Sequence, residues 1–296
     1  PNRARAIPLP AGAPRRRRAL VLGLVSVTAI ATASCADDQP ESSSAQKPYP
    51  YTAPSALQEA TSVWSAEPGL DLLSDQGLLA RGAAESEFIA NATKPDKAYW
   101  GFQWVPVKDD GRNVGKALNS NLQDANLVGT LHWRLMSLTS RKGGFDAEVC
   151  LQMRGASARF PVVHDPGKNN YVTWTVGSIQ KTRIEFRSSK RTKAIPEPAL
   201  RQTAPVAPDS QDALRWQGPS VDIFDGWQLS ITNALNVVDS DPAETAQCRA
   251  WGYTLFPPPS AEDESKARMG ASLGGGMHSV RMERPVTLPA YPGWPH

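Results

Sequence analysis

The distribution of apolar and polar residues changes from a helical to an alternating pattern along the chain. Residues 55–66 and 74–93 carry apolar side chains at helical spacing, which predicts two helices. Ser74 is a suitable N-cap for the second helix, Asp75 suits its first turn, and Pro95 ends it. The first part of the foldable sequence is therefore expected to be helical.

Later stretches alternate between apolar and polar residues and predict strands. Residues 131–137 and 147–153 each place apolar side chains on one face, and Lys142-Gly143-Gly144 between them predicts a hairpin. Residues 171–188 form a longer strand whose inward phase changes near residues 177–179, which indicates a bulge or bend. The side chains expected to face the core are Leu131, Trp133, Leu135, Ala147, Val149, Leu151, Met153, Val172, Trp174, Val176, Ile184, Phe186, Trp227, Leu229 and Ile231.

Helices first and antiparallel strands afterwards predict an α+β domain, with N-terminal helices packed on a curved antiparallel sheet. Residues 225–231 supply one more strand, and its opening Asp225-Gly226-Trp227 resembles the turn that often begins a late strand in the NTF2-like cone fold. The resemblance covers residues 55–256 by element order, and it implies helices in the mouth of a curled sheet. It transfers no catalytic residue to this chain.

A basic and then apolar leader precedes the foldable part. Four arginines at 15–18 are followed by an apolar run over residues 19–33, which is short for a membrane-spanning helix of about 20 residues. The closing Thr32-Ala33-Ser34-Cys35 resembles the lipobox of bacterial lipoproteins. This resemblance implies that residues 1–34 are a signal peptide, that Cys35 receives diacylglycerol, and that a palmitate-type chain acylates the new amino group. A plain secretory signal or an uncleaved anchor is the alternative, and both the general and the twin-arginine export routes stay open.

Composition divides the remaining chain into a stalk, a domain and a tail. Residues 35–54 are polar and rich in serine and proline, which predicts a lipidated stalk linker. The globular domain is expected over residues 55–256, with a proline-rich surface loop at 194–212. Residues 257–296 lack hydrophobic periodicity and are expected to be a disordered tail. The order of leader, stalk, helices and sheet is also similar to that of uncharacterised lipoproteins of actinobacteria.

The chain has three cysteines, and lipid on Cys35 would leave Cys150 and Cys248 as a pair. Outside the cytoplasm such a pair tends to be oxidised, so we expect a disulfide. It would close a loop of nearly a hundred residues and stabilise the fold by roughly 4 to 5 kcal/mol in the chain-entropy picture. Two separate buried thiols or a metal site are the alternatives.

The net charge of +3 comes from the leader rather than from the folded part. Six of the 32 basic residues, and none of the 29 acidic ones, precede Cys35, so the mature part has 26 basic against 29 acidic residues. We therefore do not expect the protein to bind nucleic acid. We expect no cofactor and no metal, because the chain has four histidines, two of them in the tail, without ligand spacing.

Nine tryptophans suggest an apolar ligand pocket or a surface that stacks on sugars. Alternation makes Trp133, Trp174 and Trp227 core residues. The candidate pocket residues are Trp100, Trp104 and Trp216, which lie in less regular sequence, and His132, which faces away from Trp133 on its strand. A histidine near a carboxylate could act as acid or base, but His132 also fits a solvated strand position.

Three further sequence patterns could also indicate a functional site. Gly270-Ala271-Ser272-Leu273-Gly274 with nearby His278 matches the serine-hydrolase G-x-S-x-G pattern, yet the charged segment before it contradicts the buried strand that the motif needs. His164, beside Asp165, fits a turn. A basic stretch could meet anionic lipid or cell-wall polymer, or form a solvated sheet edge. It contains Lys181, Arg183, Arg187, Lys190, Arg191 and Lys193.

These observations favour a membrane-anchored extracytoplasmic lipoprotein that serves as a non-enzymatic binding or interaction module of the cell envelope. Its expected partners are the membrane, through the lipid, and an envelope protein or an apolar ligand in the mouth of the cone. One alternative is a small-molecule enzyme of isomerase or hydrolase type that uses the cone cavity. Another is an accessory subunit of a membrane transport or secretion complex.

Overall fold

The structure is a computed structural model of the 296-residue chain. It describes residues 51–102, 107–108, 126–161, 165, 167–174, 178–188, 211–234, 242–262, 265, 278–281 and 283–294. Its elements are η1 (Ser55–Leu57), β1 (Glu59–Ala66), α1 (Asp75–Ala92), η2 (Pro95–Lys97), β2 (Val107–Lys108), β3 (Asn126–Arg141), β4 (Gly144–Gln152), β5 (Ala156–Pro161), β6 (Asn169–Trp174), β7 (Ile179–Ser188), η5 (Gln211–Leu214), β8 (Trp227–Ala234), α3 (Pro242–Leu255) and β9 (His278–Arg281). The expected α+β class with a curled, mainly antiparallel sheet is confirmed.

Helix α1 begins and ends where the sequence predicts. The Ser74 side chain accepts a hydrogen bond from the Gly77 amide at 3.1 Å, which satisfies one of the free donors of the first turn. The helix ends at Ala92, and the Thr93 hydroxyl donates to the Ile89 carbonyl at 2.6 Å. All of its residues from Gly77 to Ala92 are buried, so α1 is enclosed on every side by the rest of the domain.

The prediction of a helix over residues 55–66 is wrong. One turn of 3-10 helix, η1, is followed there by strand β1. Leu57, Ala60 and Trp64 are spaced three and four apart, which fits a helix, but Ala60 and Trp64 also share one face of a strand. β1 pairs in parallel with β3, from Glu59 opposite Val128 onward. Because a parallel pair needs a long crossover, α1 between the two strands completes a β-α-β unit.

The described strands form one nine-stranded sheet in the order β2-β8-β7-β4-β3-β5-β6-β9, with β1 on the free side of β3. β4 and β5 pair with successive parts of β3, which confirms the predicted hairpin around residues 142–144. β7 in turn pairs with β4, and β6 pairs with β5, both in antiparallel orientation. Ser157 pairs with Thr173 but Gln152 pairs with Ile179, so the register shifts by one residue between these two halves of the sheet.

That shift is the phase change predicted within residues 171–188. In β7 the buried side chains include Ile184 and Phe186, as expected. In β6 they are Tyr171 and Thr173, whereas Val172, which was expected inside, is half-buried. A one-residue offset moves every later side chain to the opposite face, and it allows long strands to bend around α1.

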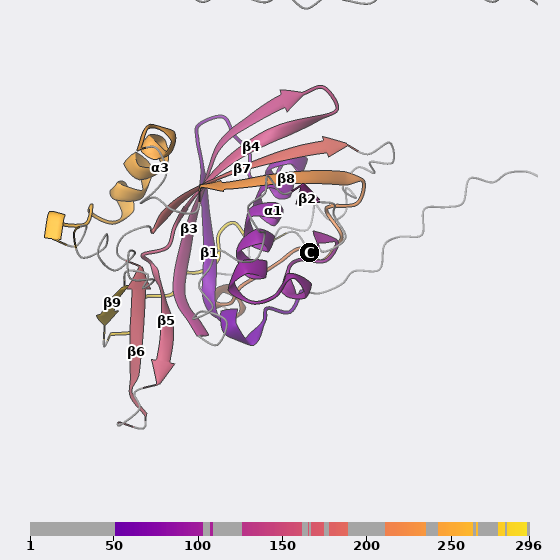
Figure 1. Cartoon of the computed structure of the whole chain (residues 1–296). Coiled ribbons are helices and arrows are strands. Elements are labelled where there is room, and N and C mark those ends of the chain that lie inside the picture. Colours follow the sequence, from indigo (N-terminus) through magenta and orange to yellow (C-terminus); the bar gives the residue numbers. More distant parts are fainter. Residues whose placement is uncertain are drawn as a thin grey trace, which may run out of the picture. The chain divides into compact units, whose positions relative to one another are not determined.

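Helix α1 lies on the concave side of the sheet (Figure 1). Buried aromatic side chains pack in the core between them. Trp64 and Trp133 stack at 5.2 Å between ring centroids, and the edge of Phe88 meets Trp133 at 6.0 Å. Gly82 lets α1 approach the segment before β8, because a Cβ at this position would lie 2.4 Å from Ile223 Cδ1. The concave side is thus packed core.

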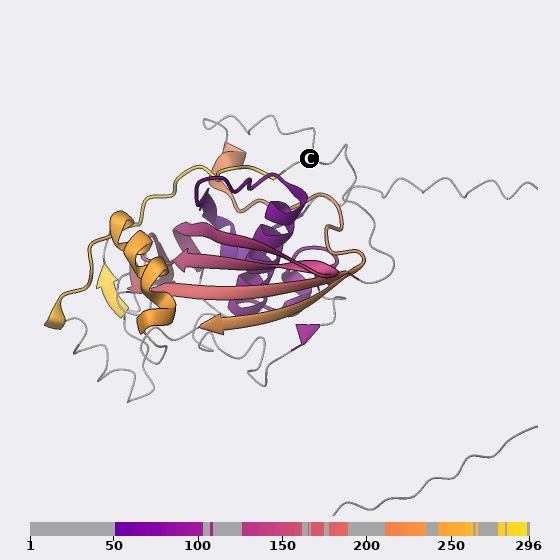
Figure 2. The same ribbon diagram turned by 90° about the horizontal axis from the view of Figure 1, so that it is seen from above.

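The opposite face of the sheet is partly covered by α3 (Figure 2). Figures 1 and 2 show α1 inside the curl of the sheet and α3 outside it. Cys248 of α3 forms a disulfide with Cys150 of β4, with a Cα–Cα distance of 5.4 Å, and both residues pack with Ile179 in a separate buried cluster. The expected disulfide is confirmed, and it fastens α3 to the sheet.

The end of the chain belongs to the fold as well. Residues 278–281 form β9 beside β6, and residues 283–294, here called the C-terminal strap, run along β1. The Trp64 amide donates to the Tyr291 carbonyl at 2.6 Å, and Trp294 is buried in the main core. The prediction of a disordered tail is wrong for these two segments, because the strap supplies partners to the exposed edge of β1.

Several predicted features lie outside the described residues. These are the signal peptide at 1–34, Cys35 with the stalk up to residue 50, Trp104, and residues 194–210 of the proline-rich loop. Within the part of the chain that the structure describes, neither helix contains an apolar stretch long enough to cross a bilayer.

Replacement of both Cys150 and Cys248 by alanine is expected to lower the free energy of unfolding by about 4 to 5 kcal/mol, because the bond closes a 98-residue separation. Urea denaturation followed by tryptophan fluorescence measures this loss. Cys35→Ala is the matched control and should unfold like the parent protein. Equal midpoints for the double variant and the control would contradict a stabilising cross-link.

Candidate functional site

A fully buried carboxylate lies between α1, β1 and the C-terminal strap. Glu85 Oε1 accepts hydrogen bonds from the Ser62 hydroxyl and from Trp64 Nε1, the latter at 2.6 Å. Glu85 Oε2 accepts from the Tyr99 hydroxyl at 2.5 Å and from Trp294 Nε1 at 3.2 Å. A carboxylate has about four acceptor sites, so these four donors occupy its capacity.

Tyr99 extends this network towards the segment before β8. Its hydroxyl accepts a hydrogen bond from Trp216 Nε1 at 2.9 Å, and its ring meets the edge of Tyr51 at 4.7 Å. Burial, and then the charge of Glu85, raises the pKa of Tyr99 well above its ordinary value. The phenol therefore stays protonated and serves as a donor to Glu85.

Arg81 lies one turn before Glu85 and is also buried. Its guanidinium lies 4.5 Å from the ring centroid of Trp294, and Nη2 donates to the Pro292 carbonyl at 2.9 Å. Burial lowers the pKa of Arg81, and the charge of Glu85 opposes that effect. Among the described atoms its Nε and Nη1 have no hydrogen-bond acceptor, so the aromatic ring faces take their place. This cluster binds the strap to α1 and leaves no acceptor of Glu85 for a substrate.

An open groove of about 600 Å³ lies on the other face of the sheet, between α3 and β3. We call it the α3 groove, and it is lined by Glu67, Arg134, Met136, Gln247, Ala250, Trp251 and Thr254. Its size falls in the range of small-molecule sites.

The groove follows from the way α3 packs on the sheet. Residues 247, 250, 251 and 254 recur at helical spacing and line one side, while Cys248 and Gly252 face the sheet. A Cβ at Gly252 would lie 2.7 Å from Ile179 Cδ1, so glycine permits the close approach of the helix. The disulfide and this glycine therefore fix the distance between the two walls.

The opposite wall comes from Arg134 and Met136 of β3 and from Glu67, which follows β1. Arg134 Nε donates to Glu67 Oε1 at 2.9 Å, and both side chains are partly exposed. Met136 and Trp251 are half-buried and pack against the cluster around the disulfide. The groove thus combines an aromatic and thioether floor with a charged pair of zero net charge, which suits a small ligand with both apolar and hydrogen-bonding parts.

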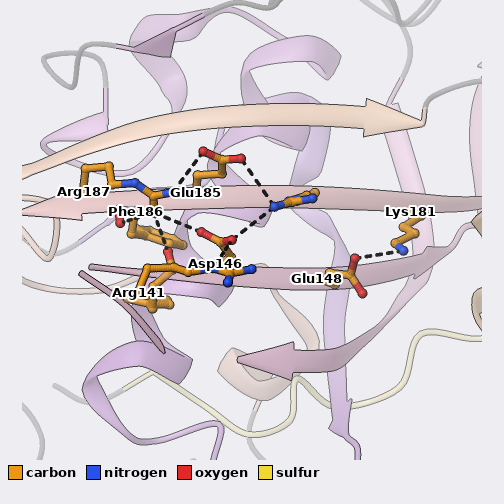
Figure 3. A network of polar contacts seen from close by, with 9 residues as sticks. Arg141, Asp146, Glu148, Lys181, Glu185, Phe186 and Arg187 are labelled. Atoms are coloured by element: carbon orange, nitrogen blue, oxygen red, sulfur yellow. Dashed lines mark hydrogen bonds and ion pairs between the residues drawn. The ribbon is translucent and has the colours of Figure 1, made fainter. Parts of the chain in front are cut away.

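A network of arginines around Asp146 occupies the same face near the β3–β4 turn (Figure 3). Asp146 is nearly buried, and it accepts from Arg141, Arg183 and Arg187 at 3.0, 3.1 and 3.0 Å. Burial alone would raise the pKa of Asp146, but hydrogen bonds from Arg187 and Arg141 and the charges of both arginines hold it below its ordinary value. Glu185 contacts two of the same arginines.

These pairs correct the expectation that the basic stretch is a solvated sheet edge. β7 lies between β4 and β8, and its Lys181 pairs with Glu148 at 3.0 Å. The cations of β7 therefore pair with acids on β4 and on their own strand. Lys190, Arg191 and Lys193 lie outside the described residues.

The structure does not bring together the three predicted pocket residues that it describes. Trp100 is 41% exposed, and Trp216 is buried in the main core, where it stacks on Phe88. His132 lies on the opposite face of the sheet, half-buried beside Phe256, and burial lowers its pKa. The prediction of one pocket from these residues is wrong, because the irregular segments carrying Trp100 and Trp216 pack against the concave side. Trp104 lies outside the described residues.

The structure does not test the G-x-S-x-G pattern or His164. Residues 270–274 and His164 lie outside the described residues, and His278 is the first residue of β9. Among the described residues no three histidine, cysteine or acidic side chains gather at metal-binding distance.

Sequence reasoning missed Glu85 and Arg81, because charged residues on a helix are ordinarily assigned to its solvated side. It also missed α3, although Pro242 followed two residues later by Glu244 is a recognisable helix start. No family profile, curated protein or solved structure matches the chain.

Glu85→Ala is expected to lower the free energy of unfolding by at least about 3 kcal/mol, because the buried donors of Ser62, Trp64 and Trp294 lose their acceptor. The Tyr99 hydroxyl keeps the Gln217 carbonyl as an acceptor at 2.7 Å. Glu85→Gln keeps one acceptor oxygen and should cost less. Chemical denaturation measures both, with the exposed Glu283→Ala as the control. A Glu85→Ala protein as stable as the control would refute the structural role of this carboxylate.

Asp146→Asn is expected to destabilise the fold by about 1–2 kcal/mol at neutral pH, since its arginine partners are about half exposed and screened by water. The pKa of Asp146 is lowered in the folded state, so its stabilisation is present above the unfolded pKa of about 3.9 and is lost as the pH falls through the folded pKa. Stability curves of the parent and the variant should therefore converge in acid.

Glu148→Gln removes a single ion pair, with Lys181, whose carboxylate is more exposed than that of Asp146. It serves as the comparison, with an expected cost below about 1 kcal/mol. A constant difference between Asp146→Asn and the parent protein from neutral pH to strong acid would contradict the assignment to Asp146.

Proposed function

We propose that this protein is a membrane-anchored extracytoplasmic lipoprotein whose domain is a non-enzymatic binding module of the cell envelope. The observation that carries the binding part is the α3 groove, whose helical wall is fastened to the sheet by the Cys150–Cys248 disulfide. A cross-linked wall keeps its shape without a ligand, and a preorganised site loses less entropy on binding.

The leader and the cysteine pair support the location. The proposal of lipid on Cys35 rests on the lipobox-like segment Thr32-Ala33-Ser34-Cys35, which follows an apolar run. A disulfide persists in oxidising compartments, so the Cys150–Cys248 bond is what an exported domain would be expected to carry. Two or three acyl chains would hold such a protein stably at a membrane.

The NTF2-like cone remains part of the proposal. A curled sheet with α1 on its concave side supports it, while β1 and α3 are additions to that pattern. The proposed ligand site moves from the mouth of the cone to the α3 groove, because α1 and its aromatic partners fill the concave side. The enzyme alternative would need an acid or base there, and Glu85 already has four donors.

The alternative of an accessory subunit in a larger assembly has one observation in its favour. Val286, Leu288 and Tyr291 of the C-terminal strap are 74%, 41% and 63% exposed, which is unusual for large apolar side chains so close together in the chain. A partner protein could cover them.

Cys35→Ala is expected to move the protein from the membrane fraction to the aqueous fraction after expression in a bacterium that processes lipoproteins. Detergent phase partition and intact mass spectrometry measure the change, and the parent should carry the added mass of diacylglycerol on a chain that begins at Cys35. Ser44→Ala is the matched control, because it changes a small polar side chain after Cys35 and leaves both the anchor cysteine and the Cys150–Cys248 disulfide in place. If Cys35→Ala leaves both membrane association and mass unaltered, the lipoprotein proposal fails.

A further inference from the structure

We infer that the α3 groove binds a carbohydrate, with a sugar ring stacked on Trp251 and its hydroxyl groups held by Arg134, Glu67 and Gln247. The inference rests on the proposed function, because it names the ligand class of the same groove. Three features of the lining carry it: a supported indole, a charge-neutral ion pair, and an exposed amide one helical turn from the indole.

Trp251 is a fixed aromatic platform. It lines the groove, yet it also packs against the cluster formed by Cys150, Cys248 and Ile179, so the indole is supported by the sheet. A pyranose ring presents a flat C–H face that can stack on the flat apolar face of an indole. Stacking on a ring that is already immobilised costs little side-chain entropy.

The Arg134–Glu67 pair favours a ligand that is neutral and both donates and accepts hydrogen bonds. The described side-chain contacts of the two residues use Arg134 Nε and Glu67 Oε1, so the terminal nitrogens of Arg134 and Oε2 of Glu67 are left for a ligand. A hydroxyl group can donate to Glu67 and accept from Arg134 at once. An ionic ligand, in contrast, would be repelled by one member of the pair.

The exposed Gln247 precedes Trp251 by one helical turn, so its amide lies on the same side of α3 as the indole. A planar amide offers donors and an acceptor, as sugar hydroxyls do. The polar groups therefore lie on both walls, Arg134 and Glu67 on the sheet side and Gln247 on α3, around one aromatic surface.

Other ligand classes fit this lining less well. A fatty acyl chain would cover the ion pair and the amide without replacing their hydrogen bonds to water, which is costly. An extended peptide is usually held by the open backbone edge of a sheet. The groove instead lies over the face of β3, and the described backbone of β3 is paired with β1 on one side and with β4 and β5 on the other.

The test titrates the purified Cys35→Ala chain with neutral disaccharides built from glucose, galactose and N-acetylglucosamine, up to millimolar concentration. Ligand-detected nuclear magnetic resonance and tryptophan fluorescence report binding. At least one disaccharide is expected to bind saturably, and Trp251→Ala should weaken that binding by about tenfold. Trp251→Phe should retain most of it, because a flat aromatic face remains.

Two comparisons separate loss of the site from loss of the fold. Trp100→Ala removes an exposed tryptophan outside the groove and should leave the affinity unchanged. Gln247→Ala alters an exposed side chain, so it should weaken binding severalfold without changing the thermal midpoint. Reduction of Cys150–Cys248 should also weaken binding, since it frees one wall of the groove.

Absence of binding by every disaccharide, or equal affinity in the parent protein and Trp251→Ala, would overturn the carbohydrate inference. Saturable binding of laurate or trialanine that depends on Trp251, without sugar binding, would also overturn it while leaving the groove as a binding site. The membrane anchor is decided separately by the mass and partition of the Cys35 variant, so the two failures are distinguishable.

Discussion

The packing of α1, β1 and the C-terminal strap against one another depends on one buried carboxylate. Glu85 joins α1 to β1 through Ser62 and Trp64, and to the C-terminal strap through Trp294. Burying a charge without partners is strongly unfavourable, so the fold is stable only when these donors come together. Three segments that are far apart in the sequence are thereby fixed around one side chain, and the concave side of the sheet closes as a packed core.

With the concave side filled, the proposed binding site lies on the opposite face of the sheet. The disulfide between Cys150 and Cys248 fastens α3 to that face, and Gly252 sets how closely the helix approaches. A helix held at a fixed distance over a bent sheet leaves a groove on its unpacked side. The same cross-link that supports the proposed export thus also shapes the proposed binding site.

Local pattern was a good guide where a single periodicity was present. The cap at Ser74, the end of α1 and the β3–β4 hairpin lie where the sequence predicts, since capping and strict alternation act over a few residues. Residues 55–66 misled, because Ala60 and Trp64 fit both a helix and a strand. Pairing with β3, about seventy residues later, decided in favour of the strand.

The sequence by itself determined the α+β class, the helix α1, the main hairpin and the cysteine pair, because each depends on short-range pattern or on simple counting. The tertiary structure decided the rest. It buried Arg81 and Glu85 on a helix that looks half polar, it ordered a strap that has no periodicity, and it separated Trp216 from His132 on opposite faces of one sheet. These outcomes depend on contacts between distant residues, and no local pattern in the chain records such contacts.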